Sequence, residues 1–302
     1  MNAQMQQDFS YVLVTAAYNE GKFLEATIKS IIAQTLRPKR WIIVNDGSTD
    51  TTGEIIDRYS AEAGFIEHCK ITEEHPRNFA AQVNAINRGL SLLEGSAYSF
   101  VGNLDADVTM GPAYFAGLMD KFRKDPGLGL AGGAICERDA DGEFRARRGN
   151  RVFSVAHACQ MFRRECFESV GGRYMQLPYG GPDTYAESMA RSKGWRVVTF
   201  DDLNVYHHRP TGSAGGVLRG WFRQGKMDYS LGTHPVFEVV KLAGRLFTKP
   251  YVVGACARFA GFALSCGRRD RRAVSKEFMS HFRGEQRERL LRPFRAGQWM
   301  RG

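Results

Sequence analysis

The chain has 302 residues, of which 43% are hydrophobic, and its 42 Lys and Arg against 32 Asp and Glu give a net charge of +10. This length and composition allow one large domain or two ordinary ones with a sizeable core, and they exclude a small domain that needs disulfide bonds to fold. The six cysteines show no CxxC pairing or zinc-like spacing, which is typical of reduced thiols in a cytosolic setting.

Strands and helices are predicted to alternate along the N-terminal part of the chain. Apolar, β-branched runs predict the strands, and apolar residues three and four positions apart predict amphipathic helices. The predicted elements are strands at 10–16, 41–45 and 65–71 and helices at 20–35, 51–59 and 79–93. This alternation indicates an α/β fold with a mostly parallel sheet flanked by helices, in which ligands bind beyond the carboxyl ends of the strands.

The stretch YSFVGNLDADV at 98–108 joins an apolar run to two aspartates. Residues 98–104 predict a short buried strand, and Asp105 and Asp107 follow where the strand gives way to a loop. Side chains two positions apart in an extended chain point the same way, so both carboxylates could converge on one Mg²⁺ or Mn²⁺, with the small Ala106 between them. A turn or helix cap is the alternative, and the tripeptide alone does not decide between them.

Further elements and a change of composition are predicted downstream. The elements are helices at 112–123, 163–170 and 184–192 and strands at 130–136, 151–162 and 195–200. The segment VYHHR at 205–209 is expected in a loop. Residues 212–233 are Gly-rich and basic, and the long segment 236–266 is mostly apolar and is predicted to be helical. We therefore predict a first domain at 1–232 and a helical, basic C-terminal region at 233–302.

The C-terminal region combines an apolar segment with a basic one. Its longest mainly apolar stretch, 251–265, is interrupted by Arg258 and is shorter than the roughly 20 residues that span a bilayer. It could lie on a membrane surface or pack over the first domain. From residue 267 to 302 there are eleven Lys and Arg against four Asp and Glu, which favours contact with an anionic membrane over nucleic acid, with a solvated tail as the alternative.

The N-terminus, MNAQMQQDFS, lacks the basic start and apolar run of a signal peptide. We therefore expect a cytoplasmic protein, peripheral at the inner face of the plasma membrane.

Several segments share a pattern with a known family. They are AAYNEGKFLEATIKSIIAQT, WIIVNDGSTDTT, Asn87-Arg88-Gly89, LDADV and FRRECFESVGG. Together they resemble family 2 of the glycosyltransferases, which have the GT-A fold and transfer sugars from nucleotide donors. The resemblance implies that residues 1–232 form a GT-A catalytic domain.

In that family the first loop and the NDGS-like block hold the nucleoside. The resemblance implies that Tyr18 stacks on the base and that Asp46 accepts a base N–H, as uracil offers. Arg77 and Arg88 flank the helix ahead of the aspartates and are expected to steady the donor phosphates. The donor-binding residues implied are Ala17, Tyr18, Glu20, Asp46, Arg77, Arg88, Asp105 and Ala106.

The resemblance also implies a metal site. Asp105 and Asp107 match the family's DxD motif, which binds Mn²⁺ or Mg²⁺ at the donor diphosphate and assists departure of the nucleotide. The segment VYHHR is similar to one in which a histidine supplies another ligand. His207 and His208 both fit, and His207 is favoured.

The family's catalytic base lies in an acidic pair just before a helix. Asp183 matches the second member, so the resemblance assigns it to deprotonating the acceptor hydroxyl for direct displacement with inversion. The chain departs from the pattern, because Pro182 replaces the expected glutamate and Tyr185 stands where a second acidic residue is common. Glu187, one turn along the same helix face, is the alternative base.

The implied function is a metal-dependent, inverting glycosyltransferase that moves a sugar from a nucleotide-diphosphate donor, expected to be a UDP-sugar. Segments from LGTHPVFEVVKL to FRGEQRERL look like the tails of bacterial surface-glycan enzymes, which implies a glycan or lipid-linked acceptor in surface polysaccharide synthesis.

Two alternatives stay open. One is a sugar-nucleotide pyrophosphorylase, although no Gly-rich loop with Lys or Arg follows the first strand to hold a triphosphate. The other is a non-catalytic protein that binds membrane or nucleic acid through its basic tail. The glycosyltransferase interpretation expects no nucleic-acid partner.

Overall fold

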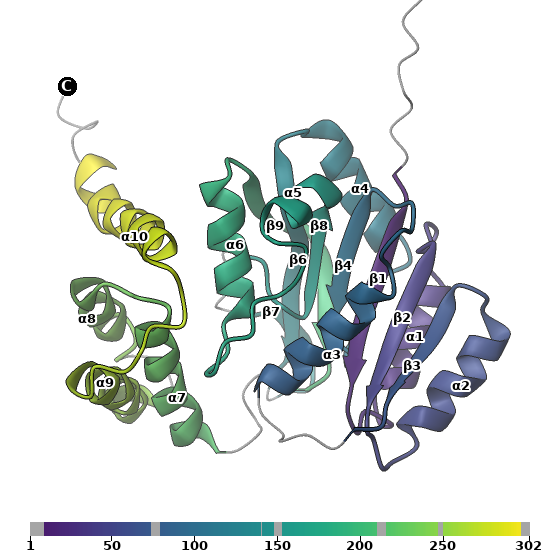
Figure 1. Cartoon of the computed structure of the whole chain (residues 1–302), viewed down its shortest axis with the longest axis horizontal. Helices are drawn as coiled ribbons and strands as arrows, with labels where there is room; N and C mark the ends of the chain where they lie inside the picture. Colours follow the sequence, from purple (N-terminus) through teal and green to yellow (C-terminus); the bar gives the residue numbers. More distant parts are fainter. Residues whose placement is uncertain are drawn as a thin grey trace, which may run out of the picture. The chain divides into compact units, whose positions relative to one another are not determined.

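The fold comes from a computed structural model that describes residues 9–73, 79–139, 141–147, 153–209, 216–246 and 250–296. The chain divides into two compact units (Figure 1). The first spans residues 1–176 and 182–210, and the second spans 177–181 and 211–302. The sequence analysis predicts a boundary after residue 232, whereas this division falls near residue 210.

The first unit is built on one mixed sheet. Its strands are β1 (Tyr11–Ala17), β2 (Arg40–Asp46), β3 (Ile66–Ile71), β4 (Phe100–Leu104), β5 (Val108–Met110), β6 (Leu128–Arg138), β7 (Phe144–Ala146), β8 (Cys159–Arg163) and β9 (Arg196–His207). Among the described residues they pair in the order β3-β2-β1-β4-β8-β6-β9-β5, with β7 on β6. The first four run parallel, and β8 is antiparallel to both β4 and β6.

Helices cover both faces of this sheet (Figure 1). They are α1 (Leu24–Ile32), α2 (Thr52–Glu62), α3 (Phe79–Ser91), α4 (Tyr114–Lys124), α5 (Arg164–Ser169) and α6 (Pro182–Ser192). Apolar residues of α1, α2 and α4 form one core, and those of α3, α5 and α6 form the other. Alternate residues of β1 point into each core, because side chains along a strand point to opposite faces. The predicted α/β architecture is confirmed.

Two strands differ from their predicted bounds. The strand predicted at 151–162 is shorter, since β8 begins at Cys159 and a turn closes just before it, with Cys159 N–H donating to Ala156 O at 3.2 Å. Residues 151 and 152 lie outside the described residues. The strand predicted at 195–200 is longer, because a register shift between Gly133 and Ala134 lets β9 keep pairing with β6 as far as His207.

The second unit is helical in its described residues. Its helices are α7 (Val217–Ser230), α8 (Pro235–Ala243), α9 (Tyr251–Gly267) and α10 (Lys276–Ala296). The helical character predicted for 236–266 is confirmed in the described residues and is divided between two helices. Helix α8 ends at Ala243, and Pro250, which has no N–H to donate, stands at the start of α9. None of the described helices combines the length and hydropathy needed to span a bilayer.

Helices α7 and α9 approach so closely that glycine is required at their contact. A Cβ on Gly225 would overlap the carbonyl oxygen of Arg258, and one on Gly261 would overlap that of Phe222. Helix α7 was not predicted, because a segment rich in glycine predicts irregular structure when its packing partner is unknown.

We expect Gly225→Ala to lower the free energy of unfolding by about 1–3 kcal/mol or more, because the added methyl group must push two backbones apart. Gly220→Ala is the matched control on α7, since a methyl group there meets no atom within 4 Å. It should be neutral or stabilising by up to about 1 kcal/mol. Urea denaturation of the variants measures the difference, and equal stabilities would contradict the close approach.

Candidate functional site

The turn that carries the two aspartates is held by three hydrogen bonds from separate parts of the first unit. Thr27 Oγ1 on α1 donates to Ala106 O at 2.8 Å. Asp105 N–H donates to Ala158 O ahead of β8, and His208 N–H donates to Asp107 O, both at 2.9 Å. Because the bonds anchor backbone atoms, both carboxylates remain available to other partners.

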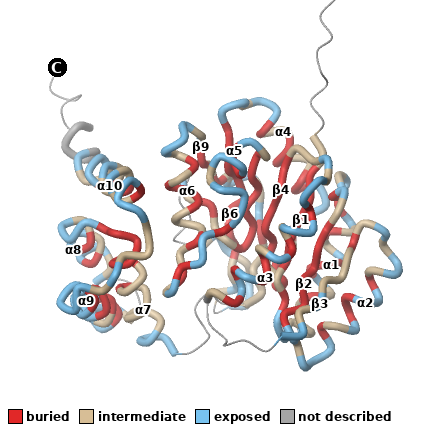
Figure 2. Tube along the Cα trace, viewed as in Figure 1, coloured by how far each residue is buried: buried red, intermediate tan, exposed pale blue. Residues whose placement is uncertain are grey.

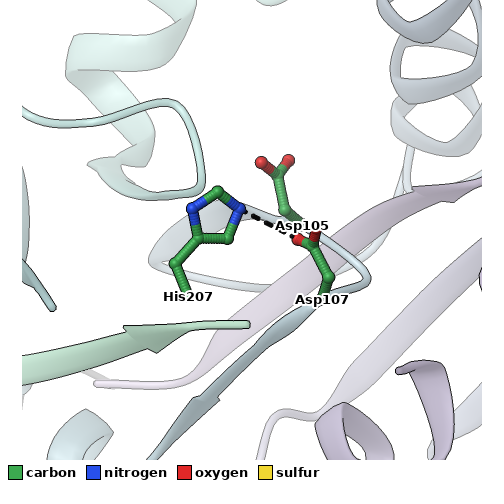
Figure 3. Close-up of side chains that lie close together, drawn as sticks. All are labelled: Asp105, Asp107 and His207. Carbon is green, nitrogen blue, oxygen red and sulfur yellow. Dashed lines mark ion pairs between the residues drawn. The ribbon is translucent and has the colours of Figure 1, made fainter. Parts of the chain in front are cut away.

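Asp105, Asp107 and His207 come together at this turn (Figure 3). Each offers a ligand atom, and these atoms lie within 4.8 Å of one another. His207 arrives because β9 pairs with β5, with His207 opposite Val108. Its Nε2 lies 3.3 Å from Asp107 Oδ1. Two carboxylates and an imidazole suit Mn²⁺, and the carboxylates suit Mg²⁺, so the donor set fits a divalent cation.

The electrostatics of His207 reflect the negative charge around it. Burial lowers the pKa of its imidazole, but the nearby carboxylates of Asp107 and of Glu137, whose Oε1 lies 3.7 Å from Nδ1, outweigh burial and raise the pKa to about 9. A proton on His207 therefore offsets carboxylate charge when no cation is bound.

His208 lies outside this cluster. Its Nε2 is 2.9 Å from Thr109 Oγ1, and its ring packs edge-on against Phe144. Of the two histidines that the sequence leaves open, the structure places His207, the favoured one, beside the aspartates.

Two further side chains contact Asp105. His157 Nδ1 lies 3.7 Å and Gln82 Nε2 lies 3.4 Å from Asp105 Oδ1. Burial alone would lower the pKa of His157, but Asp105 and, more weakly, Asp183 outweigh it and raise that pKa. His157 Nε2 is buried without a hydrogen-bond partner among the described residues. Sequence reasoning missed both side chains, since no motif marks them.

Arg209 links the aspartates to the first loop. Its Nη2 donates to Glu20 Oε2, and its Nε lies 3.6 Å from Asp107 Oδ2. Burial raises the pKa of Glu20 to about 7 against the opposing effect of Arg209, with Asp107 and Asp105 adding to the rise. Arg209 closes the VYHHR segment, and its position beside two histidines is the signal that could have found it.

The loops after β1 and β2 are joined into one edge. Asn19 N–H donates to Ser48 Oγ at 3.0 Å, and Thr49 N–H donates to Asn19 Oδ1 at 2.9 Å. Gly21 N–H donates to Asp50 Oδ2 at 3.0 Å.

This joined edge carries three predicted donor-binding residues. Ala17 and Asp46 are buried, whereas Tyr18 is 42% exposed, so its ring is accessible. Because β1 lies between β2 and β4, these residues share the carboxyl edge with Asp105.

Of the two predicted phosphate-binding arginines, Arg88 is not brought to the cluster. Arg88 is exposed in the last turn of α3, about 9 Å along the helix from Gln82. Just after Arg88, the carbonyl oxygen of Leu92 accepts a hydrogen bond from Arg40. Arg40 lies at the start of β2, and this end of the sheet is opposite to the end that carries Asp105. Arg77 lies outside the described residues.

The two candidate bases differ in their surroundings. Asp183 lies in the first turn of α6 and is partly exposed. Glu187 is buried and accepts hydrogen bonds from Val155 N–H at 2.7 Å and from Ser154 Oγ at 3.2 Å. Burial, with the charge of Asp183, raises the pKa of Glu187 to about 8.

Comparisons with solved structures bear on the fold. A mannosyltransferase from Pyrobaculum calidifontis in complex with GDP-Man and Mn²⁺ aligns with a TM-score of 0.56 at 16% identity, covering 96% of this chain and 83% of the other. TarS from S. aureus in complex with UDP-GlcNAc aligns with a TM-score of 0.54 at 13% identity, covering 90% and 78%. These likenesses show the GT-A fold.

Sequence relatives point to one family. The chain is 32% identical over 120 residues to a poly-beta-1,6-N-acetyl-D-glucosamine synthase of Staphylococcus aureus, covering 39% of this chain and 26% of the relative. It is 30% identical over 226 residues to the synthase of Staphylococcus epidermidis, covering 68% and 49%. The chain thus spans half or less of these relatives. The family model "Glycosyl transferase family 2" matches residues 12–176, more than half of the chain, which therefore belongs to that family.

Proposed function

We propose that this chain transfers a sugar from a UDP-sugar donor to a glycan or lipid-linked acceptor in surface polysaccharide synthesis, with inversion and with a divalent cation. The observation that carries the proposal is the cluster of Asp105, Asp107 and His207 at the same sheet edge as Tyr18 and Asp46. Relatives that make a poly-N-acetylglucosamine, and a fold neighbour that holds UDP-GlcNAc, support this choice of donor and product class.

The donor would lie along the carboxyl edge of the sheet. The accessible ring of Tyr18 offers a face for the base, and Asp46 offers a carboxylate to a base N–H. The diphosphate would then reach the turn at Asp105, where the Arg209 guanidinium lies 3.6 Å from Asp107. We assign Arg209 to the phosphates in place of Arg88, because it is the described arginine in contact with the cluster and can offer two parallel N–H donors.

Asp105, Asp107 and His207 would hold Mn²⁺ or Mg²⁺. A bound cation supplies charge that stabilises the departing nucleotide diphosphate. A fold neighbour that contains Mn²⁺ supports this assignment. His207 must lose its proton to act as a ligand, and its raised pKa opposes that loss until the positive cation arrives.

We assign Asp183 as the base that takes the proton from the acceptor hydroxyl. Asp183 is the more accessible of the two carboxylates. The negative charges of Asp183 and Asp105 both raise the pKa of the His157 imidazole. Glu187 is engaged by the backbone at Val155 and buried, so we give it the structural role of holding residues 154–155 against α6.

UDP with Mn²⁺ should raise the melting temperature more than GDP with Mn²⁺ or UDP alone. At a ligand concentration one hundred times Kd, binding to the folded state adds about 2.7 kcal/mol of stability. Asp107→Asn should remove the Mn²⁺-dependent part of the shift. Asp141→Asn, which neutralises an exposed carboxylate outside the cluster, should keep it. If UDP raised the melting temperature of the native chain equally with and without Mn²⁺, the metal assignment would be refuted.

Asp183→Asn should lower sugar transfer by about 100-fold or more while UDP and Mn²⁺ still bind, because a general base contributes rate and not donor affinity. The rate of transfer is measured from the release of UDP. NMR determines the anomeric configuration of the product. Unchanged transfer by Asp183→Asn together with loss in Glu187→Gln would move the base to Glu187. Pyrophosphate release from a sugar phosphate and a nucleoside triphosphate would point to a pyrophosphorylase instead.

Stability should fall as pH rises from about 4.5 to 8, because Glu187 holds its proton up to about pH 8 in the folded chain, whereas an ordinary glutamate in the unfolded chain loses its proton near pH 4.5. A tenfold difference in proton affinity is worth about 1.4 kcal/mol, which sets the scale of the loss. Glu187→Gln, which is neutral at every pH, should reduce this dependence, and the remaining slope would come from other groups with a raised pKa, such as Glu20. Urea denaturation at pH 5 and pH 9 measures it, and parallel pH profiles for both proteins would contradict the buried, protonated carboxyl.

A further inference from the structure

The second unit has charged side chains in its interior. Asp228 on α7, Glu238 on α8 and Arg258 on α9 are each 5% exposed or less. Arg258 Nε donates to Asp228 Oδ2 at 2.8 Å and to Glu238 Oε1 at 3.3 Å. Lys241 Nζ donates to the same two carboxylates, at 2.6 Å and 3.3 Å. Two positive and two negative groups therefore satisfy one another away from water.

The outer faces of α8 and α9 are apolar. Figure 2 shows exposed segments on both helices. Seven large side chains on these helices are between 49% and 57% exposed: Val236, Val239, Val240, Tyr251, Val252, Val253 and Phe259. A helix on the surface of a water-soluble domain has the opposite pattern, with its charges outside and its valines inside. An apolar face of this kind marks a surface that meets a partner.

The charge of the chain indicates the chemistry of that partner. Residues 211–302 contain eighteen Lys and Arg against six Asp and Glu, a net charge of +12, so the rest of the chain has a net charge of −2. Exposed arginines occur in the same unit, at Arg219 in the first turn of α7, the helix that packs against α9, and at Arg268 and Arg269 directly after α9. An apolar face on a basic unit is complementary to a bilayer that contains anionic lipids.

We propose that the outer faces of α8 and α9 dock on the surface of an anionic phospholipid bilayer. Helix α9, with 17 residues, is about 25 Å long and would lie in the plane of the interface with Val252 and Phe259 among the acyl chains. Arg219, Arg268 and Arg269 would meet the lipid phosphates. This proposal concerns the second unit alone and does not rest on the proposed transferase activity.

Two other occupants fit the observations less well. Nucleic acid would account for the basic residues, but it gains nothing from exposed valines on α8, because its backbone is bound by charged and hydrogen-bonding groups. A second copy would cover the valines, but each copy would bring a second unit of net charge +12 to the contact.

The test is flotation of the full chain with phosphatidylcholine vesicles that contain 0% or about 30% phosphatidylglycerol, an anionic content within the range that attracts basic segments. We expect binding to the anionic vesicles that weakens as salt is raised. Val239→Ser with Phe259→Ser should lower the partition coefficient about tenfold or more, since two apolar side chains no longer enter the interface. Arg268→Gln with Arg269→Gln should lower it only for anionic vesicles.

The control is Leu92→Ser, which removes an exposed apolar side chain from the first unit and should leave flotation unchanged. Melting temperatures and the UDP-dependent shift should match those of the native chain in every variant, so failed flotation is distinct from failed folding or failed donor binding. Equal flotation of the Val239 and Phe259 variant would overturn the proposal. The proposal would also be overturned if the native chain were a dimer that this variant dissociates, or if the chain bound oligonucleotides but not vesicles. A fall in the melting temperature of this variant would overturn it too, because the two side chains would then pack within the folded chain.

Discussion

The site in the first unit depends on compensation of the negative charge at the turn after β4. Asp105 and Asp107 are held close together by backbone hydrogen bonds, so their repulsion cannot be relieved by moving apart. Positive or protonatable groups from distant parts of the chain compensate: His157 ahead of β8, His207 at the end of β9, and Arg209 just beyond it. Positive and protonatable groups of the first unit thus offset the negative charge of the turn. Under the proposed function, a bound cation would take over this role from the proton on His207.

The sequence predicted those parts of the site that lie within a continuous motif. The strand, the two aspartates and the adjacent loops follow from apolar runs and turn residues. His157 and Gln82 could not be predicted this way, because they reach the turn only through the pairing of β8 with β4 and the packing of α3. Arg209 lies within the VYHHR segment, but its contacts could not be predicted from that segment. Arg209 and Glu20 are 189 residues apart, and no local pattern predicts contact over that separation.

The second unit shows the same limit in its packing. A glycine-rich, basic segment reads as irregular structure, yet α7 is a helix, because Gly225 lets its backbone meet that of α9. Arg258 looked like an interruption of an apolar stretch and is instead the centre of the buried ion pairs with Asp228 and Glu238. The Coulombic gain of such a pair is offset by the cost of removing both charges from water, whereas loss of one partner would leave an uncompensated charge in the interior of the unit.

The loops after β1 and β2 are hydrogen-bonded to each other, so a nucleoside would meet loops that are already arranged. Asn19, the Ser48 hydroxyl and the Thr49 backbone already hold the two loops together. Gly47 takes a left-handed turn, with φ at +70°, that other residues rarely adopt. The backbone around Asp46 is therefore ordered before any ligand arrives. A base that binds there would lose its own freedom and restrict the ring of Tyr18, but it would not have to order a loop, so little of its binding free energy would be spent on conformational entropy.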